Sequence, residues 1–479
     1  MNVGLIVYIL GVVLMFTGAF FALPAVVALI YSENAGLYFL ALSLASCLLG
    51  VVITRFKPKR HTFFARDGFA AVALSWVVLS LVGALPFYLS GEIPSYVDAL
   101  FETVSGFSTT GASILQNVEG LSKCMIFWRS FTHFLGGMGV LVFILAILPL
   151  SGGSNVMLMK AESPGPITGK LVPKVKTTAM YLYLIYFLMM VVEIIILLIS
   201  GMEPFDAVTI SFGTAGTGGF AVRNDGFSSY TPFMQSVVTV FMFLFGINFT
   251  FYYLIFTKKF KQAIKSEEVI TYFALFALSS LIISVNTLGM YSGFGESFHH
   301  AVFQVSSIMT TTGYATVDFD LWPALSKTIL VCLMFVGACG GSTGGGIKVS
   351  RMIIAFKTAV RSVRACIHPK SVHTVRMDGK AVEEETVHSV SVYFVVYVFV
   401  LFLSLVLVSI DNFDFTTNFT AIAATLNNIG PGLNGVGPMQ NFSAFSDFSK
   451  IILSLDMLVG RLELYPVLIL FSASAWKKS

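Results

Sequence analysis

Apolar residues along the chain gather into long blocks and do not alternate with polar ones. Four of the clearest blocks cover residues 4–31, 69–90, 178–200 and 388–410. Each block has the roughly 20 residues that an α-helix needs to cross the hydrocarbon core of a bilayer. The pattern therefore predicts an all-α polytopic membrane protein.

The same pattern predicts ten spans, namely two N-terminal helices over about residues 4–31 and 36–55 and then four pairs. In each pair, an apolar segment too short to span the bilayer joins the two helices. The first helices are predicted over residues 69–90, 178–200, 269–291 and 388–410. The second helices are predicted over residues 125–149, 231–256, 325–356 and 448–472. The N-terminal helix follows no basic segment and is too long for the apolar part of a signal peptide, so we expect it to be retained.

The composition excludes a soluble protein. Of the 479 residues, 56% are apolar and only 11% are charged, whereas a soluble globular protein has about 25% charged residues. The five cysteines are scattered without a pairing pattern, so the sequence indicates neither a disulfide scaffold nor a zinc site. His133, His299 and His300 show no metal-ligand spacing and no nucleophile has a base at hand, so a membrane enzyme has little support.

Basic residues are concentrated at one end of the predicted spans. Five clusters hold 21 of the 29 Lys and Arg residues, and they cover residues 55–66, 160–176, 258–265, 357–380 and 477–478. The positive-inside rule places these clusters, and with them both chain termini, in the cytoplasm. The outer loops carry 14 of the 25 acidic residues and only five basic ones. Such a face attracts cations; the alternative is that the acids only solvate the loops.

The four outer segments form an internal repeat. They run from Phe101 to Gly111, Val208 to Gly218, Phe303 to Gly313 and Thr420 to Gly430, and they align without gaps. Their final glycines are 107, 95 and 117 residues apart, so each repeat is a whole supersecondary unit. We expect four pseudo-repeated helix–pore-loop–helix units around a central pore, beside the two N-terminal transmembrane helices.

These boundaries divide the chain into five parts. Residues 1–66 hold the two extra N-terminal helices. Residues 67–176, 177–266, 267–386 and 387–479 hold the first to the fourth pore repeat. The third repeat also contains a Gly-rich intramembrane loop.

The repeated segments carry the residue types of a backbone-lined cation filter. Irregular backbone at membrane depth is tolerated where it lines a water-filled cavity, and Gly allows the φ and ψ values that an inward-facing extended strand needs. Rings of carbonyl oxygens can then replace the hydration shell of a monovalent cation. The predicted K⁺ filter comprises Thr109, Thr110, Gly111, Gly216, Thr217, Gly218, Thr311, Thr312, Gly313, Asn428, Ile429 and Gly430.

A Gly-rich run interrupts the second helix of the third repeat. As a straight helix, residues 325–356 would be about 48 Å long, well beyond the roughly 30 Å core. The interruption is predicted at Gly340, Gly341, Ser342, Thr343, Gly344, Gly345 and Gly346, because glycine is a poor helix former. We expect a loop across the pore. The alternative is close helix packing at small residues, which we accept for Gly136–Gly139.

Arg461 lies in the middle of the last predicted span, where a charge is costly and normally faces a bundle interior or a cavity. A cation below a cation filter is an electrostatic barrier, so we predict a two-part gate made of Arg461 and the Gly340–Gly346 loop. The alternative is an ion pair with Asp456 or Glu463. Two further gate contacts are predicted at Lys348 and Asn248. The first can also snorkel to the cytoplasm, and the second can also join two helices.

Five further motifs accompany the repeats, at Phe134–Gly139, Ala161–Pro166, Gly340–Lys348, Asn427–Gly432 and Gly460–Glu463. With them the whole chain resembles the TrkH family of bacterial Trk-type potassium uptake channel subunits, in the Trk/Ktr/HKT superfamily. The resemblance implies a single-chain K⁺ pore in the bacterial inner membrane, without an organic cofactor and with Arg461 at the gate. It also implies homodimerisation and a cytoplasmic nucleotide-binding regulatory subunit of the TrkA type.

The filter departs from potassium channels, because no repeat contains Thr-Val-Gly-Tyr-Gly. Preference for K⁺ over Na⁺ therefore rests on the resemblance and on glycine at all four central positions. In plant relatives Ser at the first position accompanies sodium permeation, so Gly111 resembles the potassium members. The alternative function is a Na⁺- or H⁺-coupled secondary cation transporter, or symporter, where Gly-broken helices also mark ion sites. Four parallel repeats favour the channel.

The remaining partners follow from the surface. The cytoplasmic segments Arg361–Arg376 and Lys160–Lys176 carry more positive charge than topology requires, and we predict that they dock the regulatory subunit. The alternative is the positive-inside rule alone. We expect membrane lipids around the spans and no nucleic-acid partner.

Overall fold

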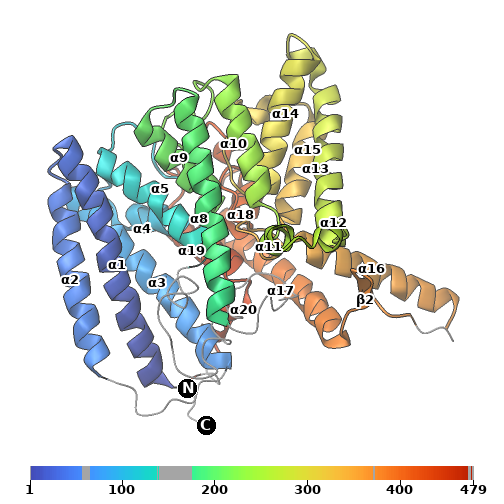
Figure 1. Ribbon diagram of the computed structural model, residues 1–479, viewed down its shortest axis with the longest axis horizontal. Coiled ribbons are helices and arrows are strands. Elements are labelled where there is room, and N and C mark those ends of the chain that lie inside the picture. The colour runs from blue at the N-terminus through green and yellow to red at the C-terminus, as the bar shows by residue number, and fades with distance from the viewer. Residues whose placement is uncertain are drawn as a thin grey trace.

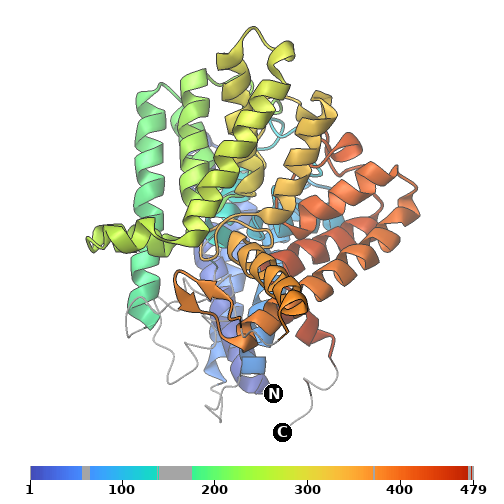
Figure 2. The ribbon, with the colours of Figure 1, turned by 90° about the vertical axis from the view of Figure 1, so that its right-hand side faces the viewer.

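The computed structural model describes residues 2–56, 65–137, 139, 175–369, 373–472 and 476. Within these ranges the chain is a bundle of helices with one short β-hairpin (Figures 1 and 2). Six of the described helices are long and apolar enough to cross a membrane, or seven if one bent pair counts as a span. The predicted all-α multi-pass membrane architecture is confirmed.

The described helices follow the predicted order. An N-terminal pair precedes four units, each with a first helix, a pore helix and a second helix. The N-terminal pair is α1 (Val3–Tyr31) and α2 (Gly36–Arg55). The first helices of the units are α3 (Ala65–Ser90), α8 (Val175–Ile199), α13 (Glu267–Asn286) and α17 (Glu384–Val408). The re-entrant pore helices are α4 (Tyr96–Phe107), α9 (Pro204–Gly216), α14 (Phe294–Met309) and α18 (Phe415–Leu426). The second helices are α5 (Lys123–Gly137), α10 (Pro232–Phe245) with α11 (Phe249–Phe256), α15 (Ala324–Val336) with α16 (Val349–Ile367), and α19 (Asp447–Arg461) with α20 (Tyr465–Leu470). The short elements are α12 (Phe260–Ile264), η1 (Leu288–Met290), η2 (Phe319–Leu321), η3 (Ser409–Asp411), η4 (Asn434–Val436), β1 (Arg376–Met377) and β2 (Lys380–Ala381).

The N-terminal pair forms an antiparallel hairpin along one edge of the molecule (Figure 1). The turn between its helices carries Glu33, whose carboxylate accepts hydrogen bonds from the backbone N–H groups of Lys123 at 2.6 Å and Cys124 at 2.9 Å. These amides open α5 and have no partner within that helix, so a nearby acid stabilises them. The hairpin is thereby tied to the first pore unit.

The second helices break in more units than the sequence predicted. Helices α10 and α11 meet at 90° around Gly246, and α19 ends where Glu463 and Leu464 adopt positive φ. Only the interruption between α15 and α16 was predicted, and the structure confirms it. The other two breaks correct the predicted spans 231–256 and 448–472. Both occur where a second helix meets the end of a pore helix, a contact that the pattern of a single span does not reveal.

The lower half of the predicted span 125–149 lies outside the described residues, apart from Gly139. The same holds for most of the segment Lys160–Lys176 and for the motif Ala161–Pro166. The described part of the first unit therefore ends at α5 and resumes at α8 in the second.

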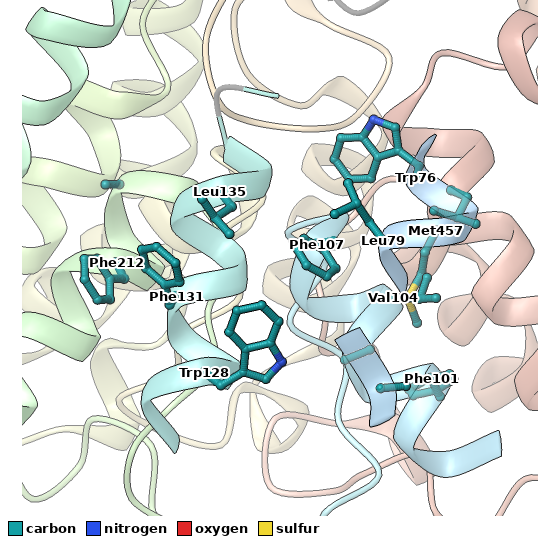
Figure 3. Close-up of a cluster of buried hydrophobic side chains, with 14 of the residues drawn as sticks. Trp76, Leu79, Phe101, Val104, Phe107, Trp128, Phe131, Leu135, Phe212 and Met457 are labelled. Atoms are coloured by element: carbon teal, nitrogen blue, oxygen red, sulfur yellow. The ribbon is translucent and has the colours of Figure 1, made fainter. Parts of the chain in front are cut away.

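Aromatic packing holds the pore helices in place. Helix α5 lies between α4 and α9 (Figure 3), with Trp128 against Phe107 at a ring separation of 5.9 Å and Phe131 against Phe212 at 5.5 Å. Each such pair contributes about 0.5–1.5 kcal/mol beyond its buried area. One helix of the first unit therefore fixes its own pore helix and that of the second.

Helix α16 leaves the bundle and carries much of the basic segment (Figure 1). The β-hairpin lies beside it (Figure 2). The two strands are antiparallel and pair Arg376 with Ala381 and Met377 with Lys380. At the start of α16, Arg351 forms an ion pair with Glu463, which links this helix to the break after α19.

Candidate ion pathway

All four pore helices end in the same hydrogen-bonded turn. A residue one or two positions after each helix end is left-handed, with φ between 53° and 60°, at Thr109, Thr217, Thr311 and Asn428. The next N–H then bonds back to the carbonyl five residues earlier, at 2.9 Å in the first unit and 2.8 Å in the others. This is the Schellman ending of a helix, in which the left-handed residue is usually Gly or Asn. A β-branched Thr there is strained, and such strain is concentrated at functional sites.

A glycine with positive φ follows two residues later in every unit. These ring glycines are Gly111, Gly219, Gly313 and Gly430, with φ of 79°, 76°, 87° and 100°. A Cβ at each of the first three would overlap a carbonyl oxygen of the next unit, and at the fourth it would lie 2.8 Å from one of the first unit. The oxygens belong in turn to Gly218, Thr312, Ile429 and Thr110. The four strands therefore close into a ring, and both the backbone angle and the close approach require glycine.

The carbonyl oxygens of this ring belong to buried residues and have no hydrogen-bond partner among the residues that the structure describes. Within the described residues, no hydrogen bond reaches the carbonyls of Thr110, Gly218, Thr312 or Ile429, and all four residues are buried. Buried carbonyls without a partner are rare in proteins. A ring of four, each from a different unit, offers the oxygen ligands that replace the hydration shell of a monovalent cation.

The gap-free alignment of the four outer segments is shifted by one residue in the second unit. The structure gives Gly219 the place that the alignment gave to Gly218, and it gives Gly218 the place of Thr110. Gly216 remains the last residue of α9 and does not belong to the ring. The signal that identifies the register is the left-handed position, since Thr, Thr, Thr and Asn stand two residues before the ring glycines.

An outer vestibule opens onto the ring. A cavity of about 160 Å³ is lined by all four ring glycines and by the loops that follow them. Acidic residues on this face are held in their charged form. Hydrogen bonds from Thr417 lower the pKa of Asp414, and those from Ser292 lower the pKa of Glu296. These two residues therefore keep the negative charge on the face that the sequence predicts to be the outer one.

A buried ion pair that sequence reasoning missed supports the first two strands. Arg129 Nε lies 2.5 Å from Glu102 Oε1, and both side chains are buried. Glu102 also accepts the N–H of Ile114 at 3.0 Å, and Arg129 donates to the carbonyl of Ala221 at 2.9 Å. The pair thus joins a pore helix to the chain that leaves two adjacent filter strands. Its only sequence signal was that Arg129 is one of the five basic residues on the predicted acidic outer side.

The Gly-rich loop lies below the ring and is tied to three units. The Gly340–Gly346 loop lies within residues 337–348, which separate α15 from α16. Gly345 N–H donates to Thr311 Oγ1 at 2.6 Å, and Gly346 N–H donates to the carbonyl of Asn427 at 3.0 Å. On the other side, Cys339 N–H donates to the carbonyl of Gly246 at 3.1 Å. The predicted loop across the pore therefore touches the ends of two pore helices and the bend between α10 and α11.

Arg461 joins this loop to the first unit. Its guanidinium donates to the carbonyls of Thr343 at 2.7 Å and of Gly136 and Gly137 at 2.6 Å each. The two parts of the predicted gate are thus in direct contact. The alternative partners are engaged elsewhere, because Glu463 pairs with Arg351 and Asp456 accepts from Ser404.

The two weaker gate candidates also lie against the loop. Lys348 is buried and donates from Nζ to the carbonyl of Gly344, so it does not snorkel to the cytoplasm. Asn248 caps α11 by accepting the N–H of Thr250 at 2.8 Å, and a Cβ at Gly341 would lie 3.2 Å from its Oδ1. The close packing expected at Gly136 is confirmed, because a Cβ there would overlap the backbone of α4.

Known proteins share both the sequence pattern and the architecture of this chain. Residues 38–478 match the sequence model of the TrkH family, described as cation transport proteins. The Trk system potassium uptake protein TrkH of Escherichia coli K12 is 34% identical over 480 residues, covering 97% of each chain. An uncharacterized cation transporter of Methanocaldococcus jannaschii is 31% identical and covers 98% of this chain and 96% of its own length. The crystal structure of the potassium transporter TrkH from Vibrio parahaemolyticus superposes with a TM-score of 0.90 at 31% identity and covers all of both chains.

Proposed function

The chain belongs to the TrkH family of cation transport proteins, and from this premise we propose that it takes up K⁺ across a bacterial inner membrane. The observation that carries the proposal is the ring of four carbonyl oxygens from the buried residues Thr110, Gly218, Thr312 and Ile429, which have no hydrogen-bond partner in the described part of the chain. Oxygens held at fixed positions by Schellman turns substitute for the water around a weakly hydrated monovalent cation. The acidic outer face concentrates that cation at the vestibule.

A gated pore accounts for the arrangement better than a coupled transporter. Transporters of the broken-helix type place one or two interrupted helices in inverted halves. Here four parallel units contribute equivalent strands to one ring, and the obstruction lies below it in the Gly-rich loop and Arg461. The symporter alternative needs a coupling site for Na⁺ or H⁺ in addition to the ring.

The gate consists of the Gly340–Gly346 loop and Arg461. The loop lies across the inner side of the ring, and the guanidinium holds it to the end of α5 through backbone carbonyls. A positive charge in a narrow, poorly hydrated passage repels K⁺, and the repulsion falls once water enters and the effective dielectric rises. Release of the loop and hydration of the passage therefore open the pore together.

The inner face docks a nucleotide-binding regulatory subunit of the TrkA type, and the chain works as a homodimer with both termini in the cytoplasm. What supports the docking is the basic helix α16, which stands clear of the bundle, with Arg361 and Arg364 exposed or half exposed along it. Changing Arg361 and Arg364 to Glu should abolish co-purification with that subunit, while Lys258→Glu on another cytoplasmic segment should not. Unchanged co-purification contradicts the docking site.

Flux through purified protein in liposomes tests the function. We expect uptake in the order K⁺ and Rb⁺ well above Na⁺ and Li⁺, without dependence on a proton gradient. Gly111→Ser or Gly313→Ser should raise Na⁺ permeation relative to K⁺, because a Cβ at either position displaces the carbonyl of the next unit. Flux that requires a proton or sodium gradient supports the coupled transporter, and unaltered preference in both variants contradicts the ring as the filter.

A further inference from the structure

The second filter strand lacks the side chain that anchors each of the others. The residues immediately before the ring glycines are Thr110, Gly218, Thr312 and Ile429. The two threonine hydroxyls bond to the hydroxyls two residues earlier, at 2.7 Å to Ser108 and 2.8 Å to Thr310. Ile429 packs into a buried apolar cluster. Gly218 has no side chain with which to do either.

A histidine of the first unit occupies the vacant space. A Cβ added at Gly218 would overlap the Cγ, Nδ1 and Cδ2 atoms of His133, so the imidazole ring stands where a side chain of this strand would be. His133 is fully buried on α5. A Cβ at Gly216, the last residue of the second pore helix, would lie 2.2 Å from the backbone carbonyl oxygen of His133. The contact therefore continues from the helix end into the strand.

The imidazole of His133 is held against the second strand by Phe220. It stacks on Phe220 with centroids 4.2 Å apart and an interplanar angle of 26°. Phe220 follows the ring glycine Gly219 directly, and its ring also receives the guanidinium of Arg129 at 3.5 Å. Arg129 and His133 lie one turn apart on α5, so Phe220 is in contact with both. Neither nitrogen of His133 has a partner among the described residues, so its ring acts on the strand by contact.

We propose that His133 is a positioning residue of the filter. From the first unit it supplies the side chain that Gly218 lacks in the second, and so it holds the Gly218 carbonyl in the carbonyl ring. The inference rests on the proposed function, because it assigns a source of K⁺ over Na⁺ preference within the same ring. It also explains why the second strand has Gly where the first and third have Thr. A side chain on the strand and an imidazole on α5 compete for one volume.

The test is a steric complementation measured as ion preference in liposomes. His133→Ala should lower the ratio of K⁺ to Na⁺ flux by about tenfold, because the second strand loses its support and its carbonyl shifts. Gly218→Thr should abolish K⁺ flux or the recovery of folded protein, because the new side chain collides with the imidazole. The double variant should restore both flux and preference beyond either single variant. Met125→Ala, which removes another buried side chain of α5 about two turns away, is the matched control and should leave the ratio unchanged.

The possible results separate this inference from the proposed function. An unchanged flux ratio in His133→Ala, or a double variant no better than Gly218→Thr, overturns the positioning role while K⁺ uptake by the unaltered protein stands. If the unaltered protein shows no K⁺ preference, the proposed function fails instead. If His133→Ala alone cannot be purified, recovery of K⁺-selective protein from the double variant still supports complementation, and failure to recover it overturns the proposal.

Discussion

Removing the guanidinium of Arg461 should open the pore without altering what passes through it. Three of its hydrogen bonds reach backbone carbonyls, one on the Gly-rich loop and two at the end of α5. If each contributes about 1 kcal/mol net, Arg461→Ala costs the closed arrangement about 3 kcal/mol. That corresponds to roughly a 150-fold shift of the equilibrium toward the open state. A closed state favoured about a hundredfold would then no longer dominate.

The assay is K⁺ flux into liposomes without any regulatory subunit, with Na⁺ measured in parallel. Arg461→Ala should raise K⁺ flux strongly and leave the flux ratio nearly unchanged, because the carbonyl ring is formed by other residues. Arg461→Lys separates the two parts of the effect, since it keeps the charge and loses the planar fork that reaches three carbonyls. If the hydrogen bonds of Arg461 hold the gate closed more than its charge does, Arg461→Lys also conducts K⁺.

Low flux from well-folded Arg461→Ala protein would refute the gate, and so would open flux accompanied by a lost K⁺ preference. The first result means that Arg461 is structural. The second means that it belongs to the filter. Thermal unfolding of the variant against the unaltered protein establishes which samples are folded.

Three further outcomes are expected. Gly219→Ala should lower the ratio of K⁺ to Na⁺ flux, because its Cβ would displace the carbonyl of the next strand, whereas Gly289→Ala, where no atom lies within 4 Å of a new Cβ, should leave the ratio unchanged; equal ratios from both argue against the corrected register. Deletion within the Gly340–Gly346 loop should raise K⁺ flux in the absence of a partner, and flux that stays low in folded protein shows that the loop is no obstruction. Glu102→Gln should lower the unfolding free energy by about 3–5 kcal/mol, because it leaves the buried charge of Arg129 unpaired; an unchanged melting temperature would contradict that ion pair.

Length and local pattern were sufficient for much of the architecture. The apolar blocks that became α1, α2, α3, α8, α13 and α17 are long enough to span the membrane by themselves. Whether a segment matches the hydrocarbon thickness depends only on its own length and apolarity. The interruption between α15 and α16 was readable for the same reason, since six glycines within residues 337–346 cannot continue a helix unaided.

The tertiary structure decided what depends on contacts between units about a hundred residues apart. Gly219 takes the ring position because its missing Cβ faces Thr312 O, and no spacing rule within the second unit distinguishes it from Gly218. The partners of Arg461, the Glu102–Arg129 ion pair and the breaks after α10 and α19 were likewise undetermined by the sequence. Hydrophobic length acts within a segment, whereas a carbonyl ring exists only once four separate segments meet. The sequence by itself determined that there would be spans, glycine-centred strands and a broken helix; the closing of the ring decided which glycine and which carbonyl of each unit form it.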